Sequence, residues 1–284
     1  MLTERTSTDT TLLNRAGVYN PAFFVEHFKK NLGRARVLPI DVGTWPTLSL
    51  AEHKSLSALI RKVGYGESAE GDLGEKLAAR TADPLDQESL LLYVQEEVRH
   101  GKEFFQLAAT LHLDVDAVKP GLGGKLTILA GRALNIGRVV DVANLLLLAE
   151  VVVLTIYKAV SQHFSHPLVA TTFQHIVADE SVHIRYHADR VRAELKKGSR
   201  RSQIVLKVGH QFALFLVLFS TKLLIGPNIK VLTGLSWSSF LDLVEADYSK
   251  IYKGDLLYFR SHWIFQSARF SLVNSFRSNG KFRI

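Results

Sequence analysis

Two segments of the sequence carry the pattern that decides the fold: Gln-Glu-Glu-Val-Arg-His at positions 95–100 and Asp-Glu-Ser-Val-His at positions 179–183. Each contains a glutamate followed three positions later by a histidine, Glu97 with His100 and Glu180 with His183. Residues i and i+3 share one face of an α-helix, so each pair can present a carboxylate and an imidazole to one metal ion. A single pair is weak evidence, because chance produces it often in a chain with 11 histidines.

The surroundings of the two pairs strengthen this prediction. At helical spacing, the first pair shares its face with Leu90, Tyr93, Phe104 and Leu107, and the second with Phe173, Ile176 and His187. Ionisable groups on an inward, apolar face are costly unless they are paired or bind a metal. Two such pairs directed into one core therefore predict a shared partner.

A third carboxylate, Glu150, lies within Leu-Leu-Leu-Leu-Ala-Glu-Val-Val-Val-Leu at positions 145–154 and is the only charge between Asp141 and Lys158. An exposed helix would conflict with the aliphatic neighbours, and a membrane span would conflict with the short, interrupted apolar length. A buried, isolated carboxylate would cost several kcal/mol or become protonated. We therefore predict that Glu150 binds a metal.

A fourth carboxylate is expected from the helix predicted before the turn at Pro84. The level that matches Glu97 across this turn lies near residue 71, so Glu70 is the preferred ligand. Glu67 lies one turn away on the same face and is the alternative, whereas Glu75 lies on another face.

The order Glu, Glu-x-x-His, Glu, Glu-x-x-His resembles the ligand order of ferritin-like non-haem di-iron oxygenases and oxidases, over roughly residues 49–197. The resemblance implies an all-α fold with a ferritin-like four-helix bundle that holds two iron ions, or manganese, which uses the same ligands. The implied ligands are Glu70 (or Glu67), Glu97, His100, Glu150, Glu180 and His183. Asp179 is expected to hydrogen-bond His100 and so to orient it, without binding the metal itself.

Within that superfamily, the p-aminobenzoate N-oxygenase branch has an additional histidine ligand on the last helix of the bundle. Here Ile176 occupies the place one turn before Glu180. His187 is the better candidate for an extra ligand and His175 the other, although His187 can also be interpreted as a hydrogen-bonded core histidine.

The implied activity is the hydroxylation, N-oxygenation or desaturation of a small organic substrate by dioxygen. Electrons would come from an external donor or reductase, since the sequence shows no flavin or nicotinamide motif. Two alternatives stay open: a ferritin-like iron-storage or manganese catalase/peroxidase protein, and a non-catalytic helical binding protein.

Composition limits the chemistry and suggests partners. The chain has no cysteine, which excludes disulfides, iron–sulfur clusters and thiolate zinc sites, so histidine and carboxylate must hold any metal. The net charge is +8, with basic clusters at 196–201 and 269–283. These are either solvated faces or docking sites for an acidic partner, such as a carrier protein that presents a tethered substrate. No nucleic-acid-binding module is visible, and a homodimer is an option.

Helix-type spacing dominates the organisation. We expect an N-terminal helical arm (1–46), a di-metal bundle (47–198) and C-terminal helices that cover the bundle (199–284), all in one compact domain. The N-terminal residues lack a signal-peptide pattern, which predicts a cytoplasmic protein. The apolar run at 211–225 is expected to be a buried helix rather than a transmembrane segment, with peripheral membrane contact as the alternative.

Overall fold

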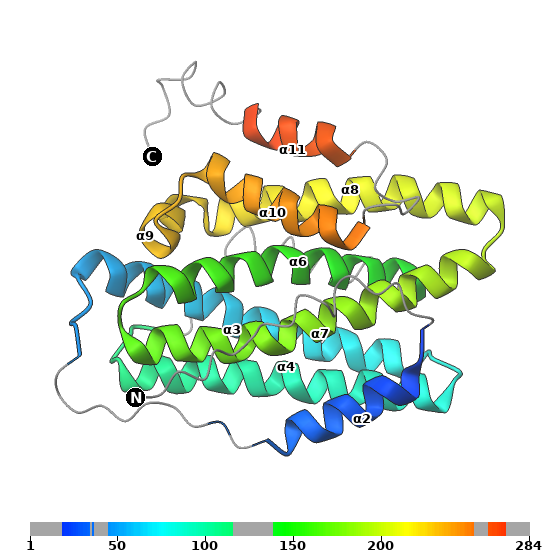
Figure 1. Cartoon of the computed structure of the whole chain (residues 1–284), viewed down its shortest axis with the longest axis horizontal. Helices are drawn as coiled ribbons and strands as arrows, with labels where there is room; N and C mark the ends of the chain where they lie inside the picture. Colours follow the sequence, from blue (N-terminus) through cyan, green and yellow to red (C-terminus); the bar gives the residue numbers. More distant parts are fainter. Residues whose placement is uncertain (1–18, 35, 37–44, 116–138, 253–260, 271–284) are drawn as a thin grey trace.

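The protein is all-α in the computed structural model, which describes residues 19–34, 36, 45–115, 139–252 and 261–270 (Figure 1). The side chains of residues 65, 68–73, 139, 261–263, 269 and 270 lie outside this description. Every regular element among the described residues is helical, which confirms that the fold is all-α. The helices are α2 (Pro21–Leu32), α3 (Leu50–Ala78), α4 (Pro84–Thr110), α6 (Val139–His163), α7 (Pro167–Lys197), α8 (Arg200–Leu224), α9 (Ile229–Thr233), α10 (Trp237–Tyr252) and α11 (Ser261–Phe270).

Local sequence signals explain where the long helices begin. Ser49 and Glu52 form a reciprocal capping box at the start of α3. Asp83 accepts hydrogen bonds from the first turn of α4 while Pro84 takes the first helical position, and Pro167 does the same for α7. Because these signals are local, the starts of these helices depend on a few neighbouring residues and not on tertiary packing.

The bundle is built from two antiparallel pairs, α3 with α4 and α6 with α7, which are each other's most extensive neighbours. α4 also packs against α7, and α3 against α6, so the four helices enclose one interior (Figure 1). α3 approaches α4 closely at Gly74, where a Cβ atom would lie 2.5 Å from Cγ2 of Val94. A residue other than glycine there would force Val94, or the backbone beside it, to shift.

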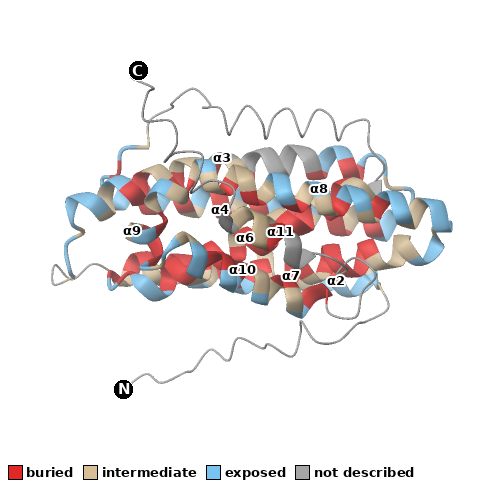
Figure 2. Ribbon diagram, turned by 90° about the horizontal axis from the view of Figure 1, so that it is seen from above, coloured by how far each residue is buried: buried red, intermediate tan, exposed pale blue. Residues whose placement is uncertain are grey.

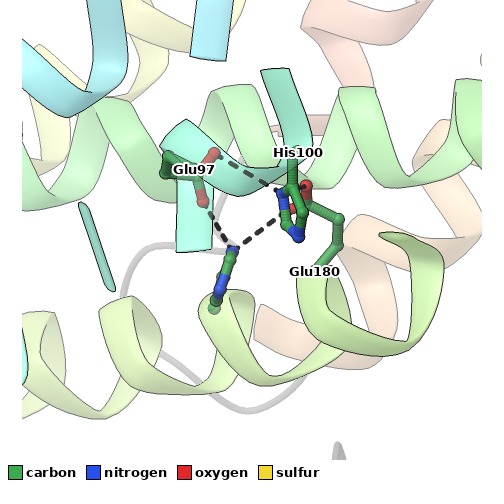
Figure 3. A group of neighbouring side chains, drawn as sticks. Glu97, His100 and Glu180 are labelled. Carbon is green, nitrogen blue, oxygen red and sulfur yellow. Dashed lines mark ion pairs between the residues drawn. The ribbon is translucent and has the colours of Figure 1, made fainter. Parts of the chain in front are cut away.

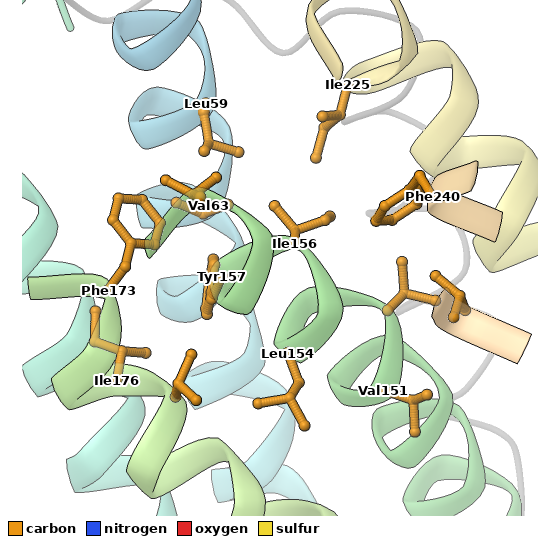
Figure 4. Close-up of a cluster of buried hydrophobic side chains, with 14 of the residues drawn as sticks. Leu59, Val63, Val151, Leu154, Ile156, Tyr157, Phe173, Ile176, Ile225 and Phe240 are labelled. Carbon is orange, nitrogen blue, oxygen red and sulfur yellow. The ribbon is translucent and has the colours of Figure 1, made fainter. Parts of the chain in front are cut away.

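The remaining helices cover the bundle from two sides. α2 packs on α4, while α8, α9 and α10 pack on α6 and α11 lies over α8 and α10. The core continues across this layer: Figure 4 shows Tyr157 and Phe173 inside the bundle, and Ile156 and Phe240 where α6 meets α10. The interior of the bundle thus lies beneath a second layer of helices.

Two described helices, α6 and α8, are long and apolar enough to cross a membrane, but they differ in burial. Most of α6 is inside the protein, whereas most of α8 is not (Figure 2). The prediction that the apolar run at 211–225 is simply buried is therefore wrong for one side of α8. Leu214 and Leu218 are buried, but Phe212 is 63% exposed and Phe215 and Leu216 are also exposed. An apolar sequence does not by itself reveal which of its faces meets a partner.

Candidate metal centre

Four of the predicted ligands meet in the interior of the bundle. Glu97 and His100 come from α4, and Glu180 and His183 come from α7. One ligand atom from each lies within 4.8 Å of the others, and all four residues are fully buried. Figure 3 shows Glu97, His100 and Glu180 converging between the two helices. Among the described residues, this cluster could hold a metal ion.

The two imidazoles turn their Nδ1 atoms towards the carboxylates. Nδ1 of His183 lies 2.8 Å from Oε1 of Glu97 and 3.3 Å from Oε2 of Glu180. Nδ1 of His100 lies 3.3 Å from Oε1 of Glu180. Neither Nδ1 atom makes a hydrogen bond within the part of the chain that the structure describes. Both Nδ1 atoms therefore lie at positions suited to binding a metal, and no hydrogen bond to a described residue accounts for their burial there.

The opposite nitrogen of each imidazole is held by a carboxylate outside the cluster. Nε2 of His100 donates to Oδ2 of Asp179 at 2.9 Å, and Nε2 of His183 donates to Oε2 of Glu96 at 2.8 Å. A donor at Nε2 leaves the lone pair of a neutral imidazole on Nδ1, directed at the cluster. Metal-binding histidines are oriented in this way by an acceptor on their other nitrogen. The contact between Asp179 and His100 is the one expected from the sequence.

Asn31, at the end of α2, joins the two orienting carboxylates. Its Nδ2 atom donates to Oε1 of Glu96 at 2.6 Å and to Oδ1 of Asp179 at 2.8 Å. Arg99 donates to Oδ2 of Asp179 at 2.8 Å, and Arg36 also pairs with that carboxylate. Although burial alone would raise it, the pKa of Glu96 is lowered by the hydrogen bonds from His183 and Asn31. Glu96 and Asp179 are thus kept as acceptors for the imidazole N–H groups.

Two further carboxylates border the cluster. Glu150 on α6 is 3% exposed, with Oε1 3.8 Å from Nδ1 of His183, and it accepts a hydrogen bond from Tyr93 at 3.0 Å. Glu67 on α3 is 4% exposed and accepts a 2.5 Å hydrogen bond from Tyr157. It is close enough to Glu97 to raise the pKa of that group. The two acids come from the two helices that lack a Glu-x-x-His pair.

The alternatives on α3 are placed differently. The side chain of Glu70, the preferred ligand from the sequence, lies outside the described residues. Glu75 is exposed, in agreement with its position on another face. Among the acids of α3 whose side chains are described, Glu67 is the one that lies at the centre, and the preference for Glu70 stays a prediction.

Burial dominates the electrostatics. Burial, followed by the nearby charges of Glu67 and Glu180, raises the pKa of Glu97 well above its ordinary value. Burial and the neighbouring Glu180 do the same for Glu150. Burial and the nearby His183 lower the pKa of His100 well below its ordinary value. Without a cation, ionisation of the carboxyl groups that lie together at this site is therefore unfavourable.

His187 follows His183 by one turn and is fully buried. Neither of its ring nitrogens has a hydrogen-bond partner among the described residues. Its ring packs edge-on against Tyr93 with centroids 4.8 Å apart, and burial lowers its pKa well below the ordinary value. The hydrogen-bonded core histidine that the sequence left open is thus not supported, but His187 is outside the four-residue cluster, and its role as a ligand stays a prediction.

Sequence reasoning missed two residues of this centre. Glu96 precedes Glu97 as Asp179 precedes Glu180, so the repeated motif itself held the signal for Glu96. Asn31 gave no signal, since it lies 65 residues from Glu96 and 148 from Asp179 in the sequence. Only the tertiary packing of α2 on α4 brings it to the site.

The donor set fits a metal of the kind held by nitrogen and oxygen ligands, because two imidazole nitrogens and several buried carboxylates converge on one place. A scan against models of protein families gives no match, and a search of curated proteins returns no significantly similar sequence.

Proposed function

We propose that the protein is a ferritin-like di-metal oxygenase or oxidase, in which two iron ions activate dioxygen to oxidise a small organic substrate. The observation that carries the proposal is the pair of inward Nδ1 atoms, of His100 and His183, each fixed by a carboxylate on its Nε2. Nothing in a purely structural core requires two buried imidazoles to turn lone pairs towards carboxylates. A metal centre requires that arrangement.

Charge favours two ions over one. Glu67, Glu97, Glu150 and Glu180 are each less than 5% exposed, and if all four ionise they contribute four negative charges. Two divalent cations balance these charges, whereas one leaves two negative charges in a low-dielectric interior. One carboxylate from each of two helices and a Glu-x-x-His from each of the other two is the ligand pattern of four-helix di-metal proteins.

The side chains have separate tasks in this proposal. Glu97, Glu180 and the two histidines bind the ions, and Glu67 and Glu150 complete the set from α3 and α6. Tyr93 and Tyr157, which donate to these last two acids, fix the carboxylate orientation. When bound, redox-active ions supply the activation of dioxygen, and the protein supplies geometry and a water-poor interior.

In a monooxygenase reaction, one oxygen atom of O2 enters the substrate and the other becomes water. The substrate gives two electrons, and an external donor gives two more together with two protons. Tyr157, Phe104 and Phe173 pack against one another beside the centre. These rings make the surroundings apolar and favour an apolar or aromatic substrate.

Oxygen consumption tests this function. The iron-loaded protein is reduced without oxygen, mixed with a set of aromatic amines, phenols and fatty acids, and then exposed to isotopically labelled dioxygen. The proposal predicts oxygen uptake that depends on a substrate and a product that is either heavier by one labelled oxygen or desaturated. Uptake that ends in stored ferric iron and leaves every substrate unchanged would favour iron storage.

The matched control is Glu75→Gln, which removes an exposed carboxylate from α3. It should react like the native protein, whereas Glu67→Gln on the same helix should not. Equal activity in both variants would contradict the placement of Glu67 at the centre.

A further inference from the structure

The outer face of α8 is a continuous apolar stripe, defined by Ile204, Val205, Val208, Phe212, Phe215, Leu216 and Leu223. All seven side chains are exposed, and Val208, the most exposed, reaches 66%. At 100° per residue, they lie within one arc of about 120° that runs along five turns of the helix. Scattered surface hydrophobics are ordinary, but a contiguous stripe of this length marks an interaction surface.

The other side of α8 shows that the helix cannot cross a bilayer on its own. Leu206, Leu214 and Leu218 are buried, and α8 packs along α6 and beneath α11. His210 on the same side is bonded to Asn144 of α6 and Tyr248 of α10. A helix packed in this way can present only its outer face to lipid, lying parallel to the membrane plane.

The charges along α8 are of one sign. The helix contains Arg200, Arg201, Lys207 and Lys222 and no acidic residue. Arg200 and Arg201 are exposed at its first turn, next to Lys196 and Lys197 at the end of α7. Lys207 borders the apolar stripe, where a long basic side chain can extend to lipid headgroups while its stem covers apolar surface. The ammonium group of Lys222 instead lies 4.5 Å from the ring centroid of Trp237.

We propose that α8 is an interfacial helix by which the protein docks on an anionic lipid bilayer, with the apolar stripe in the headgroup region and the basic residues on the lipid phosphates. An apolar face with phenylalanines and a polar border of lysine and arginine is the composition of helices that bind in this way. The all-basic border favours lipid over a second copy of the chain, because two copies of α8 would bring like charges together. The inference does not depend on the metal centre.

Vesicle flotation tests the proposal with the full-length protein. Vesicles of phosphatidylcholine alone are compared with vesicles that contain about one-third phosphatidylglycerol. The native protein should float with the anionic vesicles, only weakly with the neutral ones, and less as salt rises. The variant V208E/F212E should stay in solution, while L91E, which charges an exposed apolar position on α4, should still float.

A second variant protects the test from misfolding. R200Q/R201Q leaves the apolar stripe intact and should lower the partition coefficient on anionic vesicles by about 25-fold, because each basic residue near such a surface contributes about fivefold. Equal partition of this variant and the native protein would overturn the proposal. Failure of the native protein to bind either vesicle would also overturn it, as would a dimer in solution that V208E/F212E dissociates.

Discussion

The protein buries histidines in two contrasting surroundings. His210 lies between α6 and α10. Its Nδ1 atom is 2.7 Å from Oδ1 of Asn144, and its Nε2 atom is 2.6 Å from the hydroxyl of Tyr248. His100 and His183 have one nitrogen bonded and the other facing carboxylates. Both ring nitrogens of His210 have partners within the protein, whereas His100 and His183 belong to a cluster that could hold a metal ion. We propose that the contrast separates a polar group that stabilises the fold from a pair that binds a metal.

Of the substitutions considered, Glu97→Gln should have the largest effect on the difference between the two regions. The neutral amide keeps the size of the side chain but removes an anionic ligand, so bound metal per chain should fall close to zero. Because burial raises the pKa of Glu97, the amide also resembles the protonated acid of the metal-free protein. Metal analysis and thermal unfolding should therefore show lost metal and an intact fold. Full metal occupancy in this variant would contradict the ligand assignment.

His210→Ala should lower the stability of the fold and leave the metal content unchanged. The change leaves a cavity and removes the partner of both Asn144 and Tyr248, which should lower the free energy of unfolding by about 3 kcal/mol. The metal content should not change, because both ring nitrogens of His210 have partners within the protein. Denaturant unfolding measures the first quantity and metal analysis the second, and a fall in metal content of the folded variant would show that the two regions are coupled.

The two regions should also respond to pH with opposite signs. Burial lowers the pKa of His210 from 6.5 to about 4, so the folded protein disfavours the charged ring. Stability from this group is complete above pH 6.5 and is lost as pH falls towards 4, by about 3 kcal/mol. The stability difference between the native protein and His210→Gln should therefore shrink over this window, and a difference that does not vary with pH would exclude a buried neutral His210.

For the carboxylates of the metal-free site, stability changes with pH in the opposite direction. The folded pKa values of Glu97 and Glu150 are raised, so the acids stay protonated where the unfolded chain already ionises. The metal-free protein should become less stable as pH rises above the ordinary glutamate value of 4.5. Glu97→Gln, unfolded over the same pH range, should lose part of this dependence.

Asn31→Leu should have the smallest effect on the contrast. It removes the amide that joins Glu96 to Asp179 without touching either imidazole. Loss of such an outer contact lowers metal affinity by about 10-fold or more. Lys29→Ala is the control on the same helix, because it removes only an exposed pair with Glu88. Equal affinities of the two variants in a competition with a chelator would count against a role for Asn31.

The features of the fold and of the site that depend on local spacing could be predicted from the sequence. The i, i+3 pairs and the lone acid Glu150 identified three of the contributing helices. The choice between Glu67 and Glu70 could not be made in this way, because the two lie one turn apart on one face. Asn31 and the exposed side of α8 could not be predicted in this way either, since both depend on which helices pack together in three dimensions.

The most direct test of the central claim is the number of metal ions per chain, measured by elemental analysis after anaerobic loading with ferrous iron and removal of excess. We predict two ions per chain in the native protein and in His210→Ala, and close to none in Glu97→Gln. No bound metal in the native protein, with the same thermal stability before and after chelation, would contradict the central claim.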